Sequence, residues 1–240
     1  TKPIGMLDAA IGGKTGINHA LAKNAVGAFW QPQFVYGYVP VLQTLPPRHL
    51  HAGIGELVKY AGLIGEPFLT DVRTLIDSDG SVSQKDWMNL IATAARYKAS
   101  MVSSDERDTG VRQFLNLGHT FAHGIEQSLG YGKLLHGEAV AIGLLAACNL
   151  SDRVIPGASS RLEAFRNLVE ATIFGILGVA LDVDEIMTSM QLDKKRSGRT
   201  ARFILLNRPG NAVVKCGVDL RAVRHSLIDA IRYYDHTRRM

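Results

Sequence analysis

The sequence predicts a mainly α-helical fold with a small β-hairpin, preceded by a short region of strand and loop. Three observations support this fold class: apolar residues recur at helical spacing after residue 48, two β-branched runs flank a turn near the C-terminus, and turn and strand signals dominate the first 48 residues. Of the 240 residues, 46% are hydrophobic and 20% are charged, with 24 glycines and 8 prolines. These values exclude disorder, a collagen helix and a coiled coil as the main architecture.

The first region, residues 1–48, combines turns with one predicted strand. Gly12-Gly-Lys-Thr-Gly16 is turn-rich, and Phe34–Val39 is a β-branched and aromatic run bounded by prolines, which predicts a strand. The pair Pro46-Pro47 ends the region, because proline lacks a donor and restricts the residue before it. We therefore place a domain boundary at residue 48 and assign residues 49–240 to a second domain.

Apolar periodicity predicts three helices early in the second domain, over residues 54–64, 87–101 and 121–129. Ser83, with Asp86 three residues later, matches a capping box for the second of these helices. Glycines shortly after the third helix predict its end.

A β-hairpin and a last helix complete the predicted order of elements. Arg202–Leu206 and Ala212–Cys216 are apolar and β-branched, and the intervening segment contains Pro209-Gly210, which is typical of a hairpin turn. The periodicity of Leu220–Tyr234 predicts a final helix.

Charge and hydropathy narrow the class of partner. With 27 basic and 22 acidic residues the net charge is +5, which favours an anionic partner. The basic residues are scattered, which disfavours nucleic acid, and the longest apolar stretches, residues 139–148 and 171–181, are shorter than the roughly 20 residues of a bilayer span. Cys148 lies in an apolar run and Cys216 in a predicted strand, so we expect two buried free thiols in a cytoplasmic protein.

The spacing of three histidines suggests a metal site. His119 and His123 are four residues apart, so in a helix both imidazoles project from one face. His136 follows a glycine-containing break and approaches that face if the next helix turns back antiparallel. A catalytic zinc site with two histidines needs a carboxylate, and Glu56 and Glu138 are both candidates that the spacing leaves open.

Each of these signals also has an ordinary structural explanation. A His-x-x-x-His pair without the intervening glutamate of metalloproteases is a weak pattern, and helical histidines are usually hydrogen-bonded structural residues. The segment Gly12-Gly13-Lys14 matches neither the P-loop nor the dinucleotide-binding fingerprint. Lysines such as Lys14, Lys23, Lys59 and Lys98 are, by default, solvated charges.

Several motifs taken together resemble the 3-dehydroquinate synthase family. They are collinear with the family pattern over nearly the whole chain: Gly12–His19, Lys23-Asn24, Gln43–Arg48, Gly55–Tyr60, Ser104–Arg107, Val111-Arg112, Leu115–Phe121, Leu135–Val140 and Asp193–Lys195. Related cyclases that make inososes and valiolones share the metal scaffold but depart from this pattern around the Gly-Gly-Lys-Thr-Gly and Asn-x-Gly-His segments.

The resemblance implies a reaction and its cofactors. Members of the family convert the sugar acid phosphate DAHP to 3-dehydroquinate and phosphate in the shikimate pathway to aromatic amino acids. They use bound NAD, which is not consumed, and zinc, cobalt or another divalent cation. Oxidation, phosphate elimination, reduction and an intramolecular aldol step follow one another. By similarity, the metal ligands are Glu56, His119 and His136, which favours Glu56 over Glu138.

The resemblance also implies residues that contact the substrate and the nucleotide. The carboxylate side of the substrate corresponds to Lys98 and Arg112, with Lys59 as a further contact. The phosphate side matches Lys14, Asn24, Asn116, His123 and Lys194 or Lys195, and the nucleotide side matches Asp8, Lys14, Lys23, Val41, Leu42, Gln43 and Thr44.

The resemblance further implies that residues 1–48 are the remnant of an α/β NAD-binding domain, most of which would precede Thr1. We therefore expect this chain alone to be inactive, and the family suggests a homodimer. Asp108 stands where glutamate is usual, and Ala122 replaces a glycine. Two alternatives remain: a truncated, non-catalytic metal-binding homologue, and another sugar phosphate cyclase or an enzyme of the glycerol dehydrogenase type.

Overall fold

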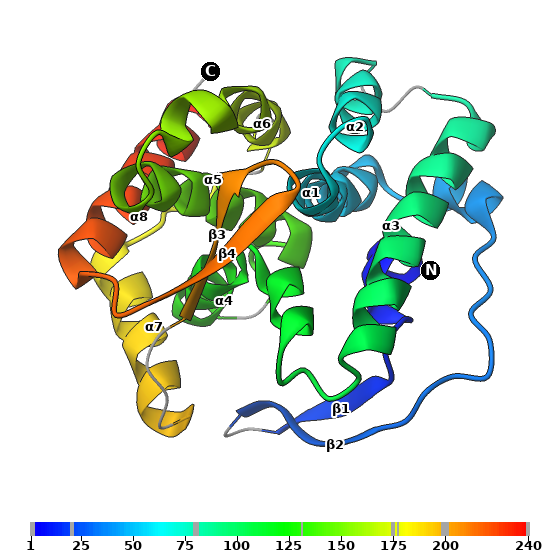
Figure 1. Cartoon of the computed structure of the whole chain (residues 1–240), viewed down its shortest axis with the longest axis horizontal. Helices are drawn as coiled ribbons and strands as arrows, with labels where there is room; N and C mark the ends of the chain where they lie inside the picture. The colour runs from blue at the N-terminus through cyan, green and yellow to red at the C-terminus, as the bar shows by residue number, and fades with distance from the viewer. Residues whose placement is uncertain are drawn as a thin grey trace.

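The computed structural model describes residues 3–19, 22–78, 82–130, 132–173, 176, 178–197 and 202–238. It confirms the mainly α-helical fold with a β-hairpin (Figure 1). The α-helices are α1 (Pro47–Ile64), α2 (Phe68–Asp77), α3 (Gln84–Ser104), α4 (His119–Leu129), α5 (His136–Val154), α6 (Ala158–Ile173), α7 (Val183–Ser197) and α8 (Leu220–Thr237). The shorter elements are the π-helix η1 (Gly5–Ala9) and the 3-10 helices η2 (Val39–Thr44) and η3 (Val111–Asn116).

Helix α5 forms the centre of the core. Every residue from Gly137 to Ser151 is buried, because this helix is apolar on all sides and packs against α1, α4, α6, α8 and strand β3. In α1, residues 52–63 are likewise all buried. These two helices also bring the polar side chains of Glu56, Lys59 and Glu138 into an otherwise apolar interior.

The strands form two separate antiparallel pairs, β1 (Lys14–His19) with β2 (Ala22–Phe29) and β3 (Arg202–Arg208) with β4 (Asn211–Cys216). The β3–β4 pair is the predicted hairpin, with Arg202 opposite Cys216 and Gly210 in the turn at a φ of 77°. Four consecutive residues of β3, Phe203–Leu206, are buried because the strand packs on α5 and α6.

The four predicted helices correspond to α1, α3, α4 and α8, although α1 starts at Pro47, seven residues before its predicted start, and α2, α5, α6 and α7 were not predicted. Helix α1 ends one residue before Gly65, and α3 begins after Ser83, whose hydroxyl accepts from the Asp86 amide while the Asp86 carboxylate accepts from the Ser83 amide. Helix α4 ends before Gly130, and α8 includes the whole of the predicted last helix.

Two predictions are wrong. Residues 34–38 belong to no strand, and Val39 already belongs to η2, so Phe34–Val39 is not a strand. A β-branched and aromatic run favours a strand, but a strand also needs a partner ladder, which depends on contacts beyond the run itself. Cys216 is exposed because it ends the outer strand β4, whereas Cys148 is buried; both thiols are free.

Large apolar side chains around the first strand pair are exposed. Trp30, Phe34 and Tyr36 have 79%, 81% and 78% of their surface accessible. The β1–β2 pair lies at one edge of the molecule, and the chain runs from it along the periphery back to α1 (Figure 1). Within the described part of the chain, no helix combines the length and the apolar character needed to cross a membrane.

Candidate metal and substrate site

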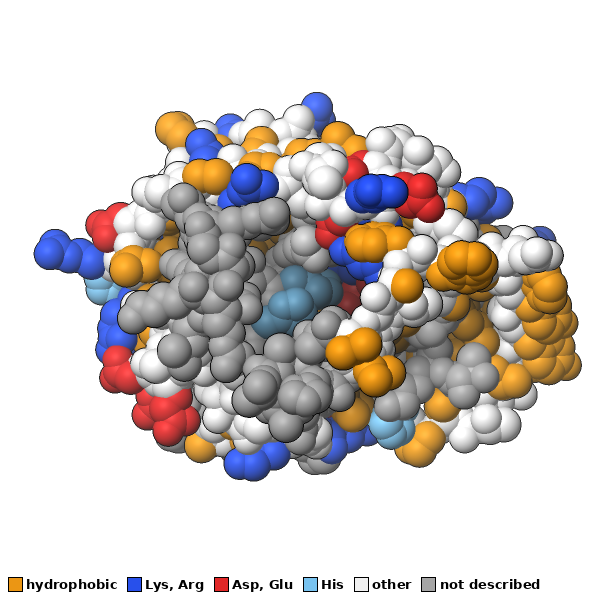
Figure 2. All heavy atoms as spheres, turned by 90° about the horizontal axis from the view of Figure 1, so that it is seen from below, with side chains coloured by type: hydrophobic (Ala, Val, Ile, Leu, Met, Phe, Trp, Pro, Cys, Tyr) orange, Lys and Arg blue, Asp and Glu red, His pale blue; other side chains and the backbone are white. Residues whose placement is uncertain are grey.

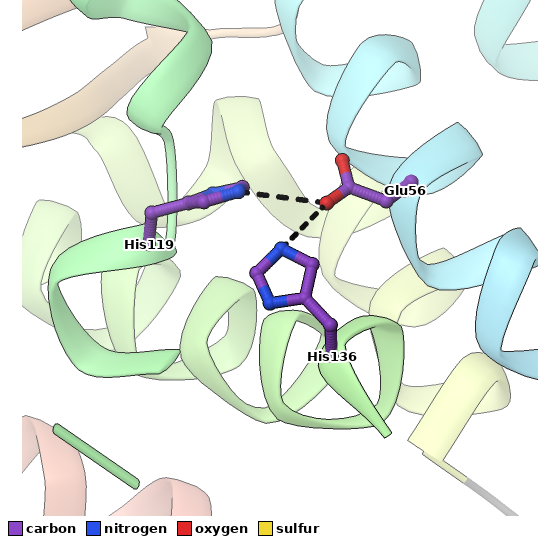
Figure 3. Close-up of side chains that lie close together, drawn as sticks. All are labelled: Glu56, His119 and His136. Atoms are coloured by element: carbon purple, nitrogen blue, oxygen red, sulfur yellow. Dashed lines mark ion pairs between the residues drawn. The ribbon is translucent and has the colours of Figure 1, made fainter. Parts of the chain in front are cut away.

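Three helices bring one carboxylate and two imidazoles together. Glu56 lies in α1, His119 is the first residue of α4 and His136 is the first residue of α5 (Figure 3). Their ligand atoms all lie within 4.8 Å of one another. His136 thus meets His119 as the antiparallel arrangement required, with ring centroids 5.2 Å apart.

Glycines allow these helices to approach closely enough. A Cβ on Gly55 would lie 2.2 Å from the carbonyl oxygen of Gly137, and a Cβ on Gly137 would lie 1.7 Å from the carbonyl oxygen of Ala52. Both separations are far below contact distance, so α1 and α5 cross with backbone against backbone. This contact sets the separation between Glu56 and His136, which are next to the two glycines in the sequence.

Another glycine positions His119. Gly118 precedes α4 in the left-handed region at a φ of 75°, a conformation that glycine adopts without steric cost. A Cβ at Gly118 would also lie 3.0 Å from Leu144 of α5. The chain therefore turns sharply at residue 118 and starts α4 with the imidazole directed toward α1.

The distances suit a cation bound between the three side chains. Glu56 Oε1 lies 3.5 Å from His119 Nε2 and 3.2 Å from His136 Nε2. Ligands about 2.1 Å from a tetrahedral zinc ion are roughly 3.4 Å from each other, which is close to both values. Three protein ligands would leave the fourth position open, as in catalytic zinc sites.

The hydrogen bonds behind the imidazoles aim both Nε2 atoms at this point. His119 Nδ1 lies 3.1 Å from the carbonyl oxygen of Leu117, and His136 Nδ1 lies 3.1 Å from Glu126 Oε1. A carbonyl oxygen accepts only, so Nδ1 of His119 is the donor and Nε2 of the neutral ring keeps its lone pair. Such outer hydrogen bonds typically orient histidine ligands of metals.

The carboxylate of Glu56 provides a further test of the fit. Its side chain is fully buried; the Lys59 ammonium lies 2.7 Å from Oε2, whereas Oε1 faces only the Nε2 atoms of the two histidines and makes no hydrogen bond of good geometry among the described residues. A buried carboxylate oxygen without a donor is costly unless a cation compensates it. A divalent cation that takes nitrogen and oxygen ligands therefore fits this site: the donor atoms are of the right kind, their separations are suitable, and the cation would compensate the buried Glu56 oxygen.

A chain of alternating charges continues from Glu56 into the interior. The Lys59 ammonium, 1% exposed, lies 2.7 Å from Glu56 and 3.0 Å from Asp8 Oδ2. Asp8 in η1 also accepts hydrogen bonds from the Lys98 ammonium, through its carboxylate and through its carbonyl oxygen at 2.6 Å. Two acids and two lysines thus join α1, η1 and α3, and a bound divalent cation would give this cluster a positive charge suited to an anion.

These contacts shift the pKa values of Glu56 and Lys59 in the directions that favour their charged forms, whereas the pKa of Lys98 shifts the other way. Burial alone would raise the pKa of Glu56, but Lys59 and then His119 outweigh it and hold the pKa well below its ordinary value. Burial disfavours the charged form of Lys59, yet Asp8 and Glu56 raise its pKa. For Lys98 burial dominates and lowers the pKa despite the nearby carboxylate of Asp8.

His136 is similarly perturbed. Burial favours its neutral form, but the carboxylates of Glu126 and Glu56 outweigh burial and raise the pKa of His136 to about 9. At neutral pH, binding of a cation at Nε2 therefore displaces a proton.

Two further candidates, Arg112 in η3 and Lys14 in β1, contact the segment that follows α3 or the residues before β1. Arg112 is 4% exposed, and its guanidinium donates to the carbonyl oxygens of Gly12 at 2.7 Å and Glu106 at 2.5 Å. Lys14, at the start of β1, is exposed and forms an ion pair with Asp108. Both cations therefore tie the first strand pair to the loop between α3 and η3.

Three other candidate residues from the sequence analysis are not part of the three-ligand cluster. Asn116 and His123 are exposed, although the His123 ring lies 5.6 Å from the ring of His119 and 6.2 Å from that of His136, measured between centroids. Glu138 accepts a bidentate pair from Arg48 at 2.7 and 2.8 Å and caps the amide of Leu135. Glu138 is thus held by the start of α1, away from the imidazoles' Nε2 atoms.

The predicted nucleotide contacts fall on η1 and η2. Asp8 belongs to the charge cluster; in η2, Val41 is partly buried, Leu42 is 5% exposed and packs in the core, and Gln43 and Thr44 are exposed. The side chains of Lys23, Asn24, Lys194 and Lys195 lie outside the described residues.

A pocket opens beside His136. A pocket of about 340 Å³ lies between η1 and the starts of α1 and α5, with His49 and His136 in its wall. This volume is at the lower end of the range for small-molecule sites, about 300–1,000 Å³. Figure 2 shows histidine side chains at the bottom of a hollow in this face, beside acidic and basic side chains.

Two residues that touch this site were not among the predicted site residues. Glu126 lies seven residues, or two helical turns, after His119, so its spacing places it on the same face of α4. Arg48 was part of a motif, but only the folded chain shows that it neutralises Glu138.

Comparison with known proteins gives consistent matches. The family model described as 3-dehydroquinate synthase C-terminal matches residues 53–196, and the one described as 3-dehydroquinate synthase N-terminal matches residues 1–52. The chain is 42% identical over 223 residues to the 3-dehydroquinate synthase of Nitrosospira multiformis and 43% identical over 220 residues to that of Pseudomonas fluorescens. These alignments cover 91% and 89% of this chain but 60% and 59% of the relatives, so the chain spans about three fifths of their length.

Solved structures share the fold. A 2-deoxy-scyllo-inosose synthase complexed with carbaglucose-6-phosphate, NAD⁺ and Co²⁺ superimposes with a TM-score of 0.83 at 23% identity, covering 95% of this chain and 64% of that one. A 2-epi-5-epi-valiolone synthase from Streptomyces hygroscopicus subsp. jinggangensis with NAD⁺ and Zn²⁺ bound gives a TM-score of 0.80 at 23% identity, covering 96% and 64%.

Proposed function

Because the chain belongs to the 3-dehydroquinate synthase family, we propose that it carries the metal- and substrate-binding part of an enzyme that converts DAHP to 3-dehydroquinate and phosphate. The observation that carries this proposal is the convergence of Glu56, His119 and His136 beside a buried cluster of lysines. A phosphorylated sugar acid is both hydroxylated and strongly anionic. It therefore suits a site that offers a cation for hydroxyl oxygens and ammonium groups for the acidic ends.

Glu56, His119 and His136 would hold a divalent cation, zinc or cobalt by the chemistry of the donor set. When bound, the cation would polarise a substrate hydroxyl, and NAD would accept a hydride from that carbon and return it later in the cycle. The ligands themselves come from three helices fixed by glycine contacts, so the site is pre-organised and needs little rearrangement to bind the substrate.

The lysines and the arginine would position the anion. Lys59 and Lys98 already bind the Asp8 carboxylate, which supports a role for their ammonium groups in holding a carboxylate at this place. Arg112 has the planar fork that suits a carboxylate, although in this structure its Nη atoms donate to backbone carbonyls. We assign Lys59, Lys98 and Arg112 to the carboxylate side of the substrate.

We assign the phosphate side and the nucleotide side from the family pattern. On the phosphate side we propose Lys14, Asn24, Asn116, His123 and one of Lys194 and Lys195. On the nucleotide side we propose Asp8, Lys14, Lys23 and the residues Val41, Leu42, Gln43 and Thr44; for Leu42 the contact would be through the backbone, since its side chain is in the core.

Three further proposals concern the domain boundary, the oligomeric state and the cellular location. We divide the chain at residue 48, which is supported by the start of α1 at Pro47 and by the change of matching family model after residue 52. The exposed Trp30, Phe34 and Tyr36 support a homodimer, because clustered apolar exposure typically marks an interface. Two free thiols support a cytoplasmic location.

Metal binding tests the ligand set directly. Glu56→Gln should lose bound zinc, measured by elemental analysis after dialysis, because the amide offers a weaker ligand and no charge. Glu138→Gln is the matched control: it removes an equally buried carboxylate in the same neighbourhood and should keep one equivalent of zinc. Equal zinc content in both variants would remove Glu56 from the ligand set.

Phosphate release from DAHP tests the activity. We expect none from this chain alone, and release that depends on NAD and a divalent cation when the N-terminal part of the Nitrosospira multiformis relative is fused ahead of Thr1. Glu56→Gln in the fusion should abolish release. A folded fusion that binds zinc but acts only on a hexose 6-phosphate, or on no sugar phosphate, would contradict the proposal in favour of another cyclase or a non-catalytic homologue.

A further inference from the structure

We propose that Glu126 is a positioning residue for the metal site: it holds the His136 imidazole from behind so that Nε2 faces Glu56. The inference deepens the proposed function, since it rests on His136 being a ligand. Glu126 is itself neither one of the three proposed ligands nor one of the residues that line the pocket beside them.

The burial of Glu126 is the first observation. Its side chain is 10% exposed and lies in α4 next to Ile125, which is fully buried. A carboxylate in such surroundings is costly unless it has a charged or hydrogen-bonding partner. Glu126 Oε1 has such a partner in His136 Nδ1, 3.1 Å away on the neighbouring helix.

The exposure of His136 is the second observation. It is the first residue of α5, and 29% of its side chain is accessible, compared with 10% for His119. Packing therefore restricts the His136 ring less than the His119 ring, and hydrogen bonds contribute more to its orientation. With Nδ1 turned to Glu126, the opposite nitrogen lies 3.2 Å from Glu56 Oε1.

The pattern at all three ligands is the third observation. Each has an outer contact that fixes it: Glu56 has Lys59 at 2.7 Å, His119 has the Leu117 carbonyl oxygen at 3.1 Å, and His136 has Glu126 at 3.1 Å. For His119 the contact is backbone and cannot be removed by substitution. Substitution of Glu126 therefore removes the outer hydrogen bond of one imidazole ligand, His136, while all three ligand residues stay in place.

The test is cobalt affinity of the whole chain, measured by competition with a chromophoric chelator, for Glu126→Leu and Glu126→Gln. We expect Glu126→Leu to weaken affinity about 10- to 100-fold, the usual effect of losing an outer hydrogen bond to a ligand. Glu126→Gln keeps an oxygen that can accept from Nδ1, so it should recover most of this loss. The matched control Asp152→Asn neutralises a carboxylate paired with Arg166 further along α5 and should bind cobalt like the parent.

A spectroscopic readout separates positioning from a purely structural role. The visible spectrum of bound cobalt should change in Glu126→Leu, because one imidazole is no longer fixed, and should return toward the parent spectrum in Glu126→Gln. Parent-like affinity and spectrum in folded Glu126→Leu would overturn the inference. Should Glu126→Leu fail to fold, a Glu126→Gln protein with parent affinity and the parent Nδ1–H proton resonance of His136 supports the inference, and loss of that resonance without any change in affinity overturns it.

The outcomes also separate this inference from the proposed function. If the parent chain binds no cobalt, or if His136→Ala binds it as well as the parent, the ligand set itself is wrong and both proposals fail. If the parent binds cobalt through His136 and none of the Glu126 variants differs, only the role of Glu126 fails.

Discussion

Replacing Gly137 with alanine tests whether the backbone contact between α1 and α5 sets the metal site. The new Cβ would lie 1.7 Å from the carbonyl oxygen of Ala52, whereas ordinary contact begins at 3.4 Å. The shortfall is about 1.7 Å, and it cannot be relieved by a side-chain rotation because the obstructing atom is backbone. The two helices must therefore move apart.

The consequence for the site is larger than the consequence for stability. Overpacking costs about 1–3 kcal/mol, and alanine returns up to about 1 kcal/mol through its helix propensity. Net destabilisation should therefore lie between about 0 and 3 kcal/mol, toward the upper end because the obstructing atom is backbone. Metal–ligand distances, however, stay within about 0.2 Å of their standard values, so separating Glu56 from His136 by a large part of the 1.7 Å shortfall should weaken zinc binding by at least the roughly 10- to 100-fold that follows the loss of an outer contact.

The assay combines two measurements on the same samples. Zinc affinity is measured by chelator competition, and the free energy of unfolding of the metal-free chain by urea titration. The control is Gly5→Ala, near the same pocket, where a Cβ would meet nothing within 4 Å. If Gly137→Ala is destabilised as expected but binds zinc with the parent affinity, then the α1–α5 contact does not set the ligand geometry.

Three further predictions concern charge and thiol chemistry. Arg48→Ala should lower the free energy of unfolding by about 2–3 kcal/mol in urea titration, less than the 3–5 of a fully buried pair because Arg48 is 36% exposed; an unchanged value would mean that Glu138 finds another partner. Burial raises the pKa of Cys148 to about 12, so at pH 8 Ellman's reagent should label only Cys216 in the folded chain and both thiols in denaturant; rapid labelling of two thiols in the folded chain would contradict this. Burial would raise the pKa of Asp8, but Lys59 and Lys98 lower it below 3.8, so its ion pairs stabilise the fold above about pH 4 and are lost as the pH falls through the folded value. Asp8→Asn should therefore lower the thermal midpoint at pH 6 and flatten its decline toward pH 3, measured by circular dichroism, and a decline parallel to that of the parent would refute the assignment.

Local sequence signals were sufficient wherever the structure depends on neighbours in the chain. The capping box of Ser83 and Asp86 fixed the start of α3, because both hydrogen bonds are made within four residues. The hairpin of β3 and β4 was likewise readable, since its turn and both strands lie within fifteen residues. Cys216 shows the limit, because which strand of a hairpin is covered depends on packing against α5 and α6.

The same limit applies to the site. Reasoning from residue types left Glu56 and Glu138 as equal candidates, and only the resemblance to a family favoured Glu56. In the folded chain Glu138 is paired with Arg48, while Glu56 lies beside the two imidazoles. The choice follows from long-range contacts, in particular the crossing of α1 and α5 through Gly55 and Gly137, that no local pattern encodes.

The sequence by itself thus predicted the helices α1, α3, α4 and α8, but not α2, α5, α6 and α7, and it indicated which side chains are able to bind a metal. Tertiary structure decided which of those side chains meet, that Phe34–Val39 stays without a strand partner among the described residues, and that Glu126 stands behind His136. The physical reason is that helix signals act over one or two turns of chain, whereas a binding site is made by contacts between helices that are distant in sequence.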